Sequence, residues 1–274
     1  MKKIGLCYHP KLPRARALVE ELSRTLEALG ASFWVCPAWE QEEARRLVPG
    51  TDLVVALGGD GTILRVARIV TQEGTPILGA GLGRVGFLSE VEPEEVVGKT
   101  RAFLGGEGWV EDRMMLAASV PPDGQEQHGL NDVVVGRGPV PRIIHVRASI
   151  DGYPYATFAA DGVVVATPTG STGYSMAAGG PLVHPDVQGI VMTPIAPHLS
   201  LGHPLVLPAT ASLDLQVVIA DQQATLTIDG QIDMPLRDGD TVRVRRSERV
   251  TRFLRFDPMT HYYGVLSQRL KCKE

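Results

Sequence analysis

The sequence predicts an α/β N-terminal domain with a parallel, doubly wound sheet, followed by a β-rich C-terminal domain. Two observations support this fold class. Over the first ~105 residues, short apolar strands alternate with segments whose apolar residues recur every three to four positions, as in amphipathic helices. From about residue 110 the apolar residues recur at every second position, as in half-buried strands. Strands that are separated by helices pair in parallel, because the crossover returns the chain to the same end of the sheet.

The N-terminal elements follow from this pattern in chain order. An apolar strand at 4–8 precedes a helix at 14–29, and Gly30 marks the end of that helix. The strand expected at 52–57 is apolar throughout, which is typical of a parallel strand that is buried on both faces. The other elements expected in this half are strands at 32–35 and 75–78 and helices at 40–48, 62–72 and 93–104.

The C-terminal half is expected to consist mainly of strands. Asp-Gly pairs at 151–152, 229–230 and 238–239 provide turns between them. Glycines at 105–108 mark the boundary, so we expect an α/β domain at 1–108, a β-rich domain at 109–258, and a C-terminal segment at 259–274 that packs back on the first domain. The expected strands are 142–150, 153–160, 211–219, 223–228 and 241–256.

The composition excludes several classes of protein. Of 274 residues, 27 are Lys or Arg and 31 are Asp or Glu, so the net charge is -4 and there is no basic field for nucleic acid. The cysteines, Cys7, Cys36 and Cys272, form no C-x-x-C pair, which disfavours a zinc site or a disulfide framework and indicates a reducing compartment. The uncharged stretches at 162–185 and 187–213 are interrupted by prolines, so they do not predict membrane spans. We therefore expect a cytoplasmic protein without nucleic-acid or membrane partners.

The sharpest local motif is the glycine-rich loop at 58–62 (GGDGT), which lies between a buried strand and a helix. Glycines let the backbone approach phosphates closely, and the amides at the start of a helix favour anions. The hydroxyl of Thr62 could cap that helix. Because Asp60 repels phosphate, it is better suited to accepting the proton of a hydroxyl group, or to binding a metal ion on the phosphates. The alternative is a plain glycine turn in which Asp60 caps the helix.

Three further segments carry candidate ligand groups. The stretch 81–86 (GLGRVG) matches G-x-G-x-x-G, but no amphipathic helix follows it, which disfavours a dehydrogenase-type fingerprint. An apolar strand leads into the segment 166–175, whose hydroxyls and glycines could hold ribose or phosphate oxygens or could form a simple turn. Asp161 lies just before that strand and could be a residue of a hairpin turn. If its carboxylate is buried instead, it needs an ion-pair or hydrogen-bond partner. Asn131 could bind an adenine or amide edge, or could simply begin a strand.

Together these segments resemble the NAD kinase family. GGDGT alone is shared with lipid kinases of the diacylglycerol kinase type and with phosphofructokinases, whereas TPTGSTGYS at 167–175 is much more specific. The chain departs from the family pattern at Gly81, Asp132 and Gly173, where asparagine, glutamate and alanine are frequent. The matching strings are LGGDGTILR (57–65), PILGAGLGRVGFL (76–88), LNDVV (130–134), DGVVVATPTGSTGYSMAAGGP (161–181) and DGQ (229–231).

The resemblance implies transfer of the γ-phosphoryl group of ATP, or of polyphosphate in some members, to the adenosine-ribose 2′-hydroxyl of NAD, which gives NADP and ADP. It implies an NAD kinase and diacylglycerol kinase-like fold with the NAD site between the two domains. It also implies a divalent ion such as Mg²⁺, without identifying metal ligands in this chain, and a homodimer or homotetramer.

Matched position by position, the resemblance makes Asp60 the catalytic base that accepts the 2′-hydroxyl proton, and it makes Tyr174 a side chain that stacks against a base. The residues implied to bind ATP or its phosphates are Gly58, Gly59, Gly61, Thr62 and Arg65. The residues implied to bind NAD are Asp60, Gly61, Arg65, Asn131, Asp132, Arg142, Ala159, Asp161, Thr169, Thr172, Gly173, Tyr174, Ser175, Met176, Ala177, Ala196 and Gln231.

Two other functions stay open at this point. A lipid or sugar kinase could share the GGDGT loop, and it would phosphorylate its own substrate without forming NADP. A non-catalytic NAD(P)-binding sensor could keep the binding pocket without turnover, although the retained Asp60 argues against it.

Overall fold

The computed structural model describes residues 2–83, 86–122, 124–140, 142–198, 202–219, 223–259 and 261–270. The chain divides into two compact units. Unit 1 contains the two segments Met1–Asp112 and Thr251–Glu274, and unit 2 contains Arg113–Val250. The domain boundaries expected after residues 108 and 258 stay a prediction. Arg84, Val85 and Cys272 lie outside the described residues.

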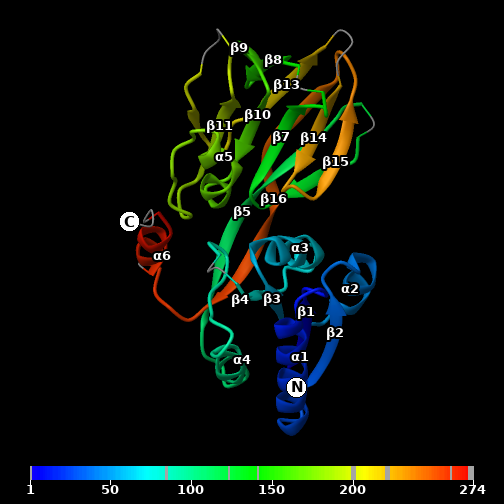
Figure 1. Cartoon of the computed structure of the whole chain (residues 1–274), viewed down its shortest axis with the longest axis vertical. Coiled ribbons are helices and arrows are strands. Elements are labelled where there is room, and N and C mark those ends of the chain that lie inside the picture. The colour runs from blue at the N-terminus through cyan, green and yellow to red at the C-terminus, as the bar shows by residue number, and fades with distance from the viewer. Residues whose placement is uncertain are drawn as a thin grey trace. The chain divides into compact units, whose positions relative to one another are not determined.

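Unit 1 is built on a parallel sheet in the order β2-β1-β3-β4 (Figure 1). Every residue of β3 is buried, as its apolar sequence predicts for a central strand. The strand order reverses between β1 and β3, because the chain first runs outward to β2 and then returns to β3 and β4. Open α/β sheets bind ligands at such a switch point, at the carboxyl ends of the strands. The strands are β1 (Lys3–Tyr8), β2 (Ser32–Pro37), β3 (Leu53–Gly58) and β4 (Ile77–Gly81).

Helices cover both faces of this sheet, so it is doubly wound as predicted. α1 (Pro13–Ala28) packs its buried leucines on the face that carries Ile4 and Leu6 of β1. α3 (Asp60–Val70) covers the opposite face, where Ile63 lies against Gly79 of β4. The other helices of unit 1 are α2 (Gln41–Leu47), α4 (Val96–Leu104) and α6 (His261–Leu270). Within the described residues, no helix is both long enough and apolar enough to cross a membrane.

Unit 2 contains two sheets with an apolar core between them. One is a six-stranded antiparallel sheet in the order β12-β11-β10-β7-β14-β15, and the other includes the antiparallel run β16-β13-β8-β9. Alternate residues of the strands form the core, including Val133 and Val135 of β7 and Leu213 and Leu215 of β13. The elements from this half onward are β5 (Trp109–Ser119), β6 (Gln127–Gly129), β7 (Asp132–Arg137), β8 (Ile144–Ile150), β9 (Tyr153–Ala160), β10 (Gly162–Ala166), η1 (Thr169–Thr172), α5 (Tyr174–Ala177), β11 (Gly189–Ile195), β12 (Leu205–Pro208), β13 (Leu213–Val218), β14 (Ala224–Ile228), β15 (Ile232–Leu236) and β16 (Thr241–Arg255).

Asp-Gly turns join the strands where the sequence predicts them. Asp151 and Asp229 both have a φ of 51°, and they are followed by Gly152 at 82° and Gly230 at 61°. Left-handed conformations at both central positions are what a two-residue hairpin turn requires, and Asp-Gly adopts them readily. Most expected strands agree with the observed ones to within two residues at each end, whereas the sequence pattern does not predict β5, β6, β11, β12 or β15.

A buried ion-pair network in unit 1 holds the end of β16. The guanidinium of Arg255 contacts Glu111 (Nε to Oε2, 2.7 Å) and Glu90 (Nη1 to Oε2, 3.0 Å). The other oxygen of Glu90 accepts the backbone amides of Phe256 and Asp257 at 2.8 and 3.2 Å. The three charged side chains are at most 8% exposed, so each depends on its partners to offset the loss of hydration.

Arg255→Ala is expected to destabilise unit 1 by about 3–5 kcal/mol, because it removes the guanidinium that offsets the burial of the Glu90 and Glu111 carboxylates. Arg243→Ala is the matched control: Arg243 forms an exposed ion pair with Asp214 (2.8 Å), and its loss should leave the melting temperature nearly unchanged. Thermal unfolding followed by circular dichroism measures both variants. If Arg255→Ala melted at the same temperature as Arg243→Ala, a stabilising role for the buried network would be contradicted.

Candidate functional site

The GGDGT loop lies at the carboxyl end of β3, beside the switch point of the sheet in unit 1. β3 ends at Gly58, and α3 begins at Asp60 with Gly59 as its N-cap residue. No side chain caps α3, so the expectation that Thr62 caps this helix is wrong. The helix begins two residues earlier than the sequence suggests, which places Thr62 inside the first turn, where its hydroxyl is buried. The positive end of the α3 dipole faces this loop and favours an anion there.

The carboxylate of Asp60 joins the two glycine-rich segments of unit 1. It accepts the backbone amide of Phe87 at Oδ2 (2.7 Å) and that of Leu88 at Oδ1 (3.2 Å). A second link runs from the amide of Leu82 to the carbonyl oxygen of Gly58 at 3.1 Å. Asp60 is therefore not the helix cap of a plain glycine turn. No helix begins within 86–95, in agreement with the interpretation that 81–86 is not a dehydrogenase-type fingerprint.

Arg65 lies farther along α3, against an aromatic ring. Its guanidinium carbon is 4.6 Å from the centre of the Trp39 ring, and the ring of Trp39 contacts that of His9 with centres 4.4 Å apart. The amide of His9 donates to the carbonyl oxygen of Leu57 at 3.0 Å, so this cluster adjoins the end of β3. A cation that lies over an aromatic face is attracted by the ring electrons, so Trp39 restricts where the Arg65 charge can go.

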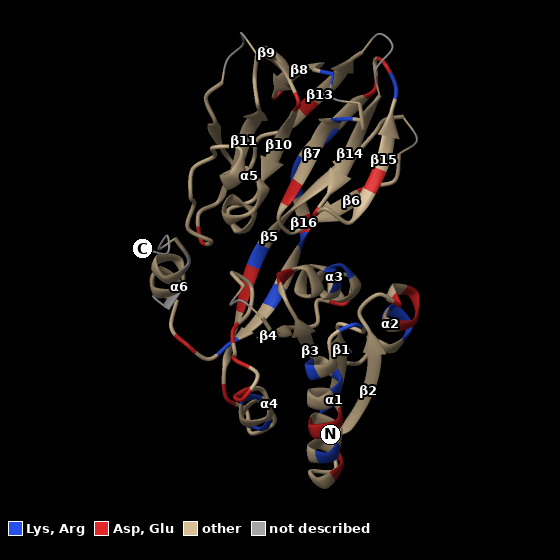
Figure 2. Ribbon diagram, viewed as in Figure 1, with Lys and Arg blue, Asp and Glu red and all other residues tan. Residues whose placement is uncertain are grey.

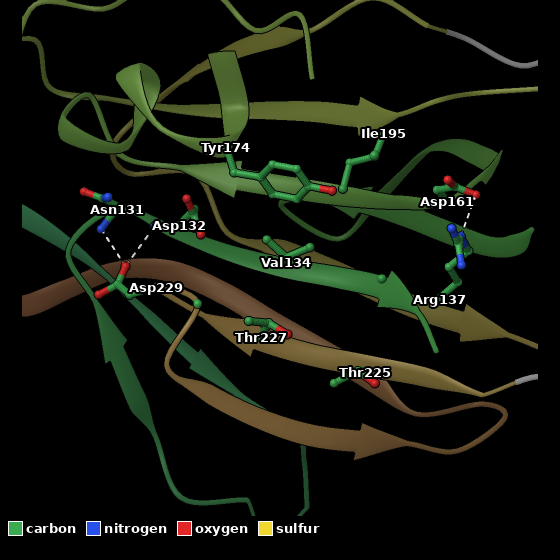
Figure 3. Close-up of a pocket in the computed structure, with 12 residues that line it drawn as sticks. Asn131, Asp132, Val134, Arg137, Asp161, Tyr174, Ile195, Thr225, Thr227 and Asp229 are labelled. Atoms are coloured by element: carbon green, nitrogen blue, oxygen red, sulfur yellow. Dashed lines mark hydrogen bonds and ion pairs between the residues drawn. The ribbon is translucent and has the colours of Figure 1, made fainter. Parts of the chain in front are cut away.

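Unit 2 contains a cavity of about 600 Å³, which is within the usual range for small-molecule sites (Figure 3). Its floor is one face of the paired strands β7 and β14, on which Val134 pairs with Thr227 and Gly136 with Thr225. In Figure 3, the ring of Tyr174 extends from α5 over this floor. The cavity is lined by Asn131, Asp132, Val134, Gly136, Arg137, Asp161, Tyr174, Ile195, Thr225, Thr227, Asp229 and Gly230.

Four of the residues predicted to bind NAD line this cavity: Asn131, Asp132, Asp161 and Tyr174. Ser175 and Thr169 are buried outside it. The hydroxyl of Ser175 shares a hydrogen bond with that of Thr193 at 3.3 Å, and the hydroxyl of Thr169 accepts from Arg113 at 3.3 Å. The remaining predicted residues of unit 2 do not belong to the lining and stay predictions; they are Arg142, Ala159, Thr172, Gly173, Met176, Ala177, Ala196 and Gln231.

The floor of the cavity is not among the predicted site residues, although the sequence contains a signal for it. Positions 133 and 135 of β7 and positions 224, 226 and 228 of β14 belong to the core. The intervening residues, Val134, Thr225 and Thr227, must therefore point away from the core, since neighbouring residues of a strand face opposite sides. The missing information is the pairing of β7 with β14, which joins segments about 90 residues apart.

One end of the cavity holds two neighbouring carboxyl groups. Asp229 accepts the amides of three consecutive residues, Leu130 (2.8 Å), Asn131 (2.7 Å) and Asp132 (3.1 Å), and so fixes the turn before β7. Burial raises the pKa of Asp132 to about 7, and the nearby charge of Asp229 is the second cause. The side-chain oxygen of Asn131 is buried and has no hydrogen-bond partner among the described residues. Asp229 belongs to the DGQ string of the family resemblance but is not among the predicted site residues.

The other end of the cavity holds an ion pair between Arg137 and Asp161, with Nε and Oδ1 2.9 Å apart (Figure 3). Asp161 has the partner that a buried carboxylate would need, but its side chain is 37% exposed. Between the two ends, Val134 and Ile195 provide an apolar stretch. Figure 2 shows no charged residue on β10, β11 or α5, which surround this stretch. Polar ends with an apolar middle suit an extended ligand that has polar groups at both ends.

The described residues contain no group of three or more His, Cys, Asp or Glu side chains that could hold a metal ion. In nucleotide-dependent enzymes, Mg²⁺ is often held by one or two carboxylates together with substrate phosphates and water. Asp60 is the carboxylate of the GGDGT loop, and each of its oxygens retains a lone pair beyond its one amide bond. The residues present therefore fit an ion that is bound mainly through phosphates, and they do not form a metal cage.

Both halves of the chain match the family models of one group of kinases. The model of the ATP-NAD kinase N-terminal domain matches residues 5–107, and that of the ATP-NAD kinase C-terminal domain matches residues 130–256. An NAD kinase of Dehalococcoides mccartyi (strain CBDB1) is 43% identical, over 98% of this chain and 96% of its own. An NAD kinase of Citrifermentans bemidjiense is 40% identical over 100% of both chains. The chain therefore belongs to the NAD kinase family.

Two solved structures agree with this assignment. Yeast NADH kinase in complex with NADH has a TM-score of 0.87 and 27% identity, covering 100% of this chain and 89% of its own. An NAD kinase from Archaeoglobus fulgidus in complex with ATP has a TM-score of 0.79 and 28% identity, covering 97% of this chain and 98% of its own. The predicted fold class is confirmed, and the chain is an enzyme with NAD kinase activity.

The raised pKa of Asp132 predicts a pH dependence of stability. Between pH ~4, near the unfolded pKa of 3.8, and the folded pKa of about 7, the unfolded chain has released a proton that the folded chain keeps. The stability of the wild-type protein therefore falls as pH rises through this window. The Asp132→Asn variant has no carboxyl group at this position and so lacks this pH-dependent loss. The free energy of unfolding of the variant minus that of the wild type should therefore rise by up to about 4 kcal/mol from pH 4 to pH 8. Urea unfolding at both pH values measures the difference, and a parallel pH dependence of the two proteins would refute it.

Proposed function

We propose that this enzyme transfers the γ-phosphoryl group of ATP to the adenosine-ribose 2′-hydroxyl of NAD, and that Asp60 is the base that accepts the hydroxyl proton. The observation that carries this proposal is the position of Asp60. Its carboxylate lies on the GGDGT loop, at the carboxyl edge of the parallel sheet of unit 1, and is oriented by the amides of Phe87 and Leu88. The complexes of the yeast and Archaeoglobus relatives, with NADH and with ATP, support the two substrates.

The chemistry needs a base because a ribose hydroxyl is a weak nucleophile. A positioned carboxylate can contribute about 10²–10⁴-fold to the rate. As the hydroxyl oxygen bonds to the γ-phosphorus, its proton passes to Asp60, and the bond from the γ-phosphorus to the β,γ-bridging oxygen breaks with release of ADP. The rest of the rate enhancement in phosphoryl transfer comes mainly from positioning and charge stabilisation.

The donor phosphates are assigned to the loop itself. Gly58, Gly59, Gly61 and Thr62 bring the backbone at the start of α3 close to the phosphates, and the helix dipole favours their negative charge. Arg65 adds a full positive charge on the same helix, held against Trp39. A divalent ion such as Mg²⁺, when bound, neutralises charge on the phosphates. The phosphates would provide most of the ligands of this ion, and Asp60 is the carboxylate of the loop that would contribute to holding it.

The cavity of unit 2 is assigned to NAD. The buried oxygen of Asn131 is an acceptor without a partner, which suits an N–H donor such as the amino group of adenine. Asp132 and Asp161 can accept hydrogen bonds from hydroxyl or amide groups at the two ends of the cavity. Tyr174 is 47% exposed, and an exposed aromatic side chain can stack on a planar base. The other predicted NAD-binding residues form part of the same proposal.

The cellular compartment and the oligomeric state are also part of the proposal. Cys7 and Cys36 are buried and free, which suits a reducing cytoplasm. Burial raises the pKa of the Cys7 thiol, so it behaves as a small apolar side chain. A homodimer or homotetramer is proposed from the family resemblance.

Asp60→Asn is expected to keep the fold, because the side-chain oxygen of asparagine can still accept one of the two backbone amides, and to lower kcat by about 10²–10⁴-fold. The assay incubates the enzyme with ATP, Mg²⁺ and NAD and detects NADP with an NADP-specific dehydrogenase. Asp186→Asn is a control, because the side chain of Asp186 is 60% exposed and lies outside the assigned residues. Near-native kcat in Asp60→Asn would overturn the base assignment.

A further inference from the structure

We propose that Gly86 is a positioning residue for the base: the missing side chain at this position leaves the space that the carboxylate of Asp60 occupies. This inference rests on the proposed function, in which Asp60 accepts the hydroxyl proton. A β-carbon built at Gly86 would overlap Cγ and both carboxylate oxygens of Asp60. The backbone of Gly86 is not in the left-handed region, so its glycine is required by space and not by conformation.

The chain around Gly86 is fixed by its own hydrogen bonds. The hydroxyl of Ser89 accepts the amide of Gly86 at 3.1 Å and donates to the carbonyl oxygen of Gly86 at 3.3 Å. The turn is then tied to β4, because the amide of Glu90 donates to the carbonyl oxygen of Gly79 at 2.8 Å. A side chain at position 86 therefore has little room to move away, and the Asp60 carboxylate would have to shift instead.

A shifted carboxylate loses its orientation. In the native arrangement the amides of Phe87 and Leu88 each bind a different oxygen of Asp60, which fixes both the position and the plane of the carboxylate. A proton acceptor must lie within hydrogen-bond reach of the hydroxyl that it serves, and a displacement of about 1 Å can cost 10²-fold in rate. Gly86 thus acts on the reaction through Asp60 and does not itself touch the substrate.

The same loop offers a matched control at Gly83. Among the described residues, a β-carbon at Gly83 would meet no atom within 4 Å, and its backbone is also outside the left-handed region. Gly83→Ala and Gly86→Ala therefore make the same chemical change three residues apart. Only the β-carbon at position 86 overlaps Asp60.

The test measures kcat, the KM for NAD and the melting temperature of Gly86→Ala and Gly83→Ala, alone and combined with Asp60→Asn. Gly86→Ala should lower kcat at least tenfold with the KM for NAD within threefold of the wild type, and Gly83→Ala should remain near the wild type. In the Asp60→Asn background, Gly86→Ala should lower kcat less than threefold further, because its target is already inactive. Equal effects of the two alanines, or a multiplied loss in the double variant, would overturn the proposal.

A second pair of variants distinguishes a general folding defect in Gly86→Ala from the specific overlap with Asp60. Asp60→Ala removes the atoms that a β-carbon at position 86 would overlap, so the double variant Asp60→Ala/Gly86→Ala should melt at a higher temperature than Gly86→Ala alone. No such recovery would overturn the packing argument. Full kcat in Gly86→Ala together with a strong loss in Asp60→Asn would overturn the role of Gly86 and leave the proposed function intact. Near-native kcat in Asp60→Asn would instead overturn the base assignment, and with it this inference.

Discussion

The candidate site of unit 1 depends on one interaction, the pair of hydrogen bonds that the carboxylate of Asp60 accepts from consecutive backbone amides. That carboxylate joins the GGDGT loop to the backbone of residues 87 and 88, which follow the second glycine-rich segment. The buried strand β3 brings one segment to the edge of the sheet, and the hydrogen bonds of Glu90 to β4 bring the other. The carboxylate that could serve as a base is thus also the group that fixes the backbone around it.

The cavity of unit 2 uses carboxylates in a similar way. Asp229 accepts the backbone amides of residues 130–132 and so fixes the turn from which the side chains of Asn131 and Asp132 line the cavity. Placing Asp132 in a buried position beside a second carboxylate costs stability, and this cost grows from pH ~4 up to its raised pKa of about 7 and remains above that pH. Natural proteins tolerate such costs at functional sites, where local stability is exchanged for a group in a required position. The charge at this end of the cavity therefore changes near neutral pH.

Local patterns in the sequence predict the elements but not the contacts between them. The apolar run of β3 and the Asp-Gly turns at Asp151 and Asp229 are local properties, and the structure has them where they are expected. The failures involve contacts between distant segments. The pair of Arg137 with Asp161 and the bonds of Asp229 to residues 130–132 join positions that no single window contains. Thr62 has the chemistry of a helix cap, but Gly59 takes that place because the helix starts earlier than the apolar periodicity indicates.

The division of unit 1 into two chain segments has a consequence for synthesis on the ribosome. Phe253 pairs with Ile77 of β4, and Arg255 neutralises Glu90 and Glu111, so the first unit to emerge lacks parts that are made last. Unit 2 is continuous, from Arg113 to Val250, and can collapse as soon as it leaves the exit tunnel. Domains usually fold as units from the N-terminus during synthesis, but unit 1 cannot be completed before unit 2 has been made, because its last segment follows unit 2 in the chain. Until translation passes residue 255, Glu90 and Glu111 lack the guanidinium that they contact in the folded protein, and unit 1 cannot be completed.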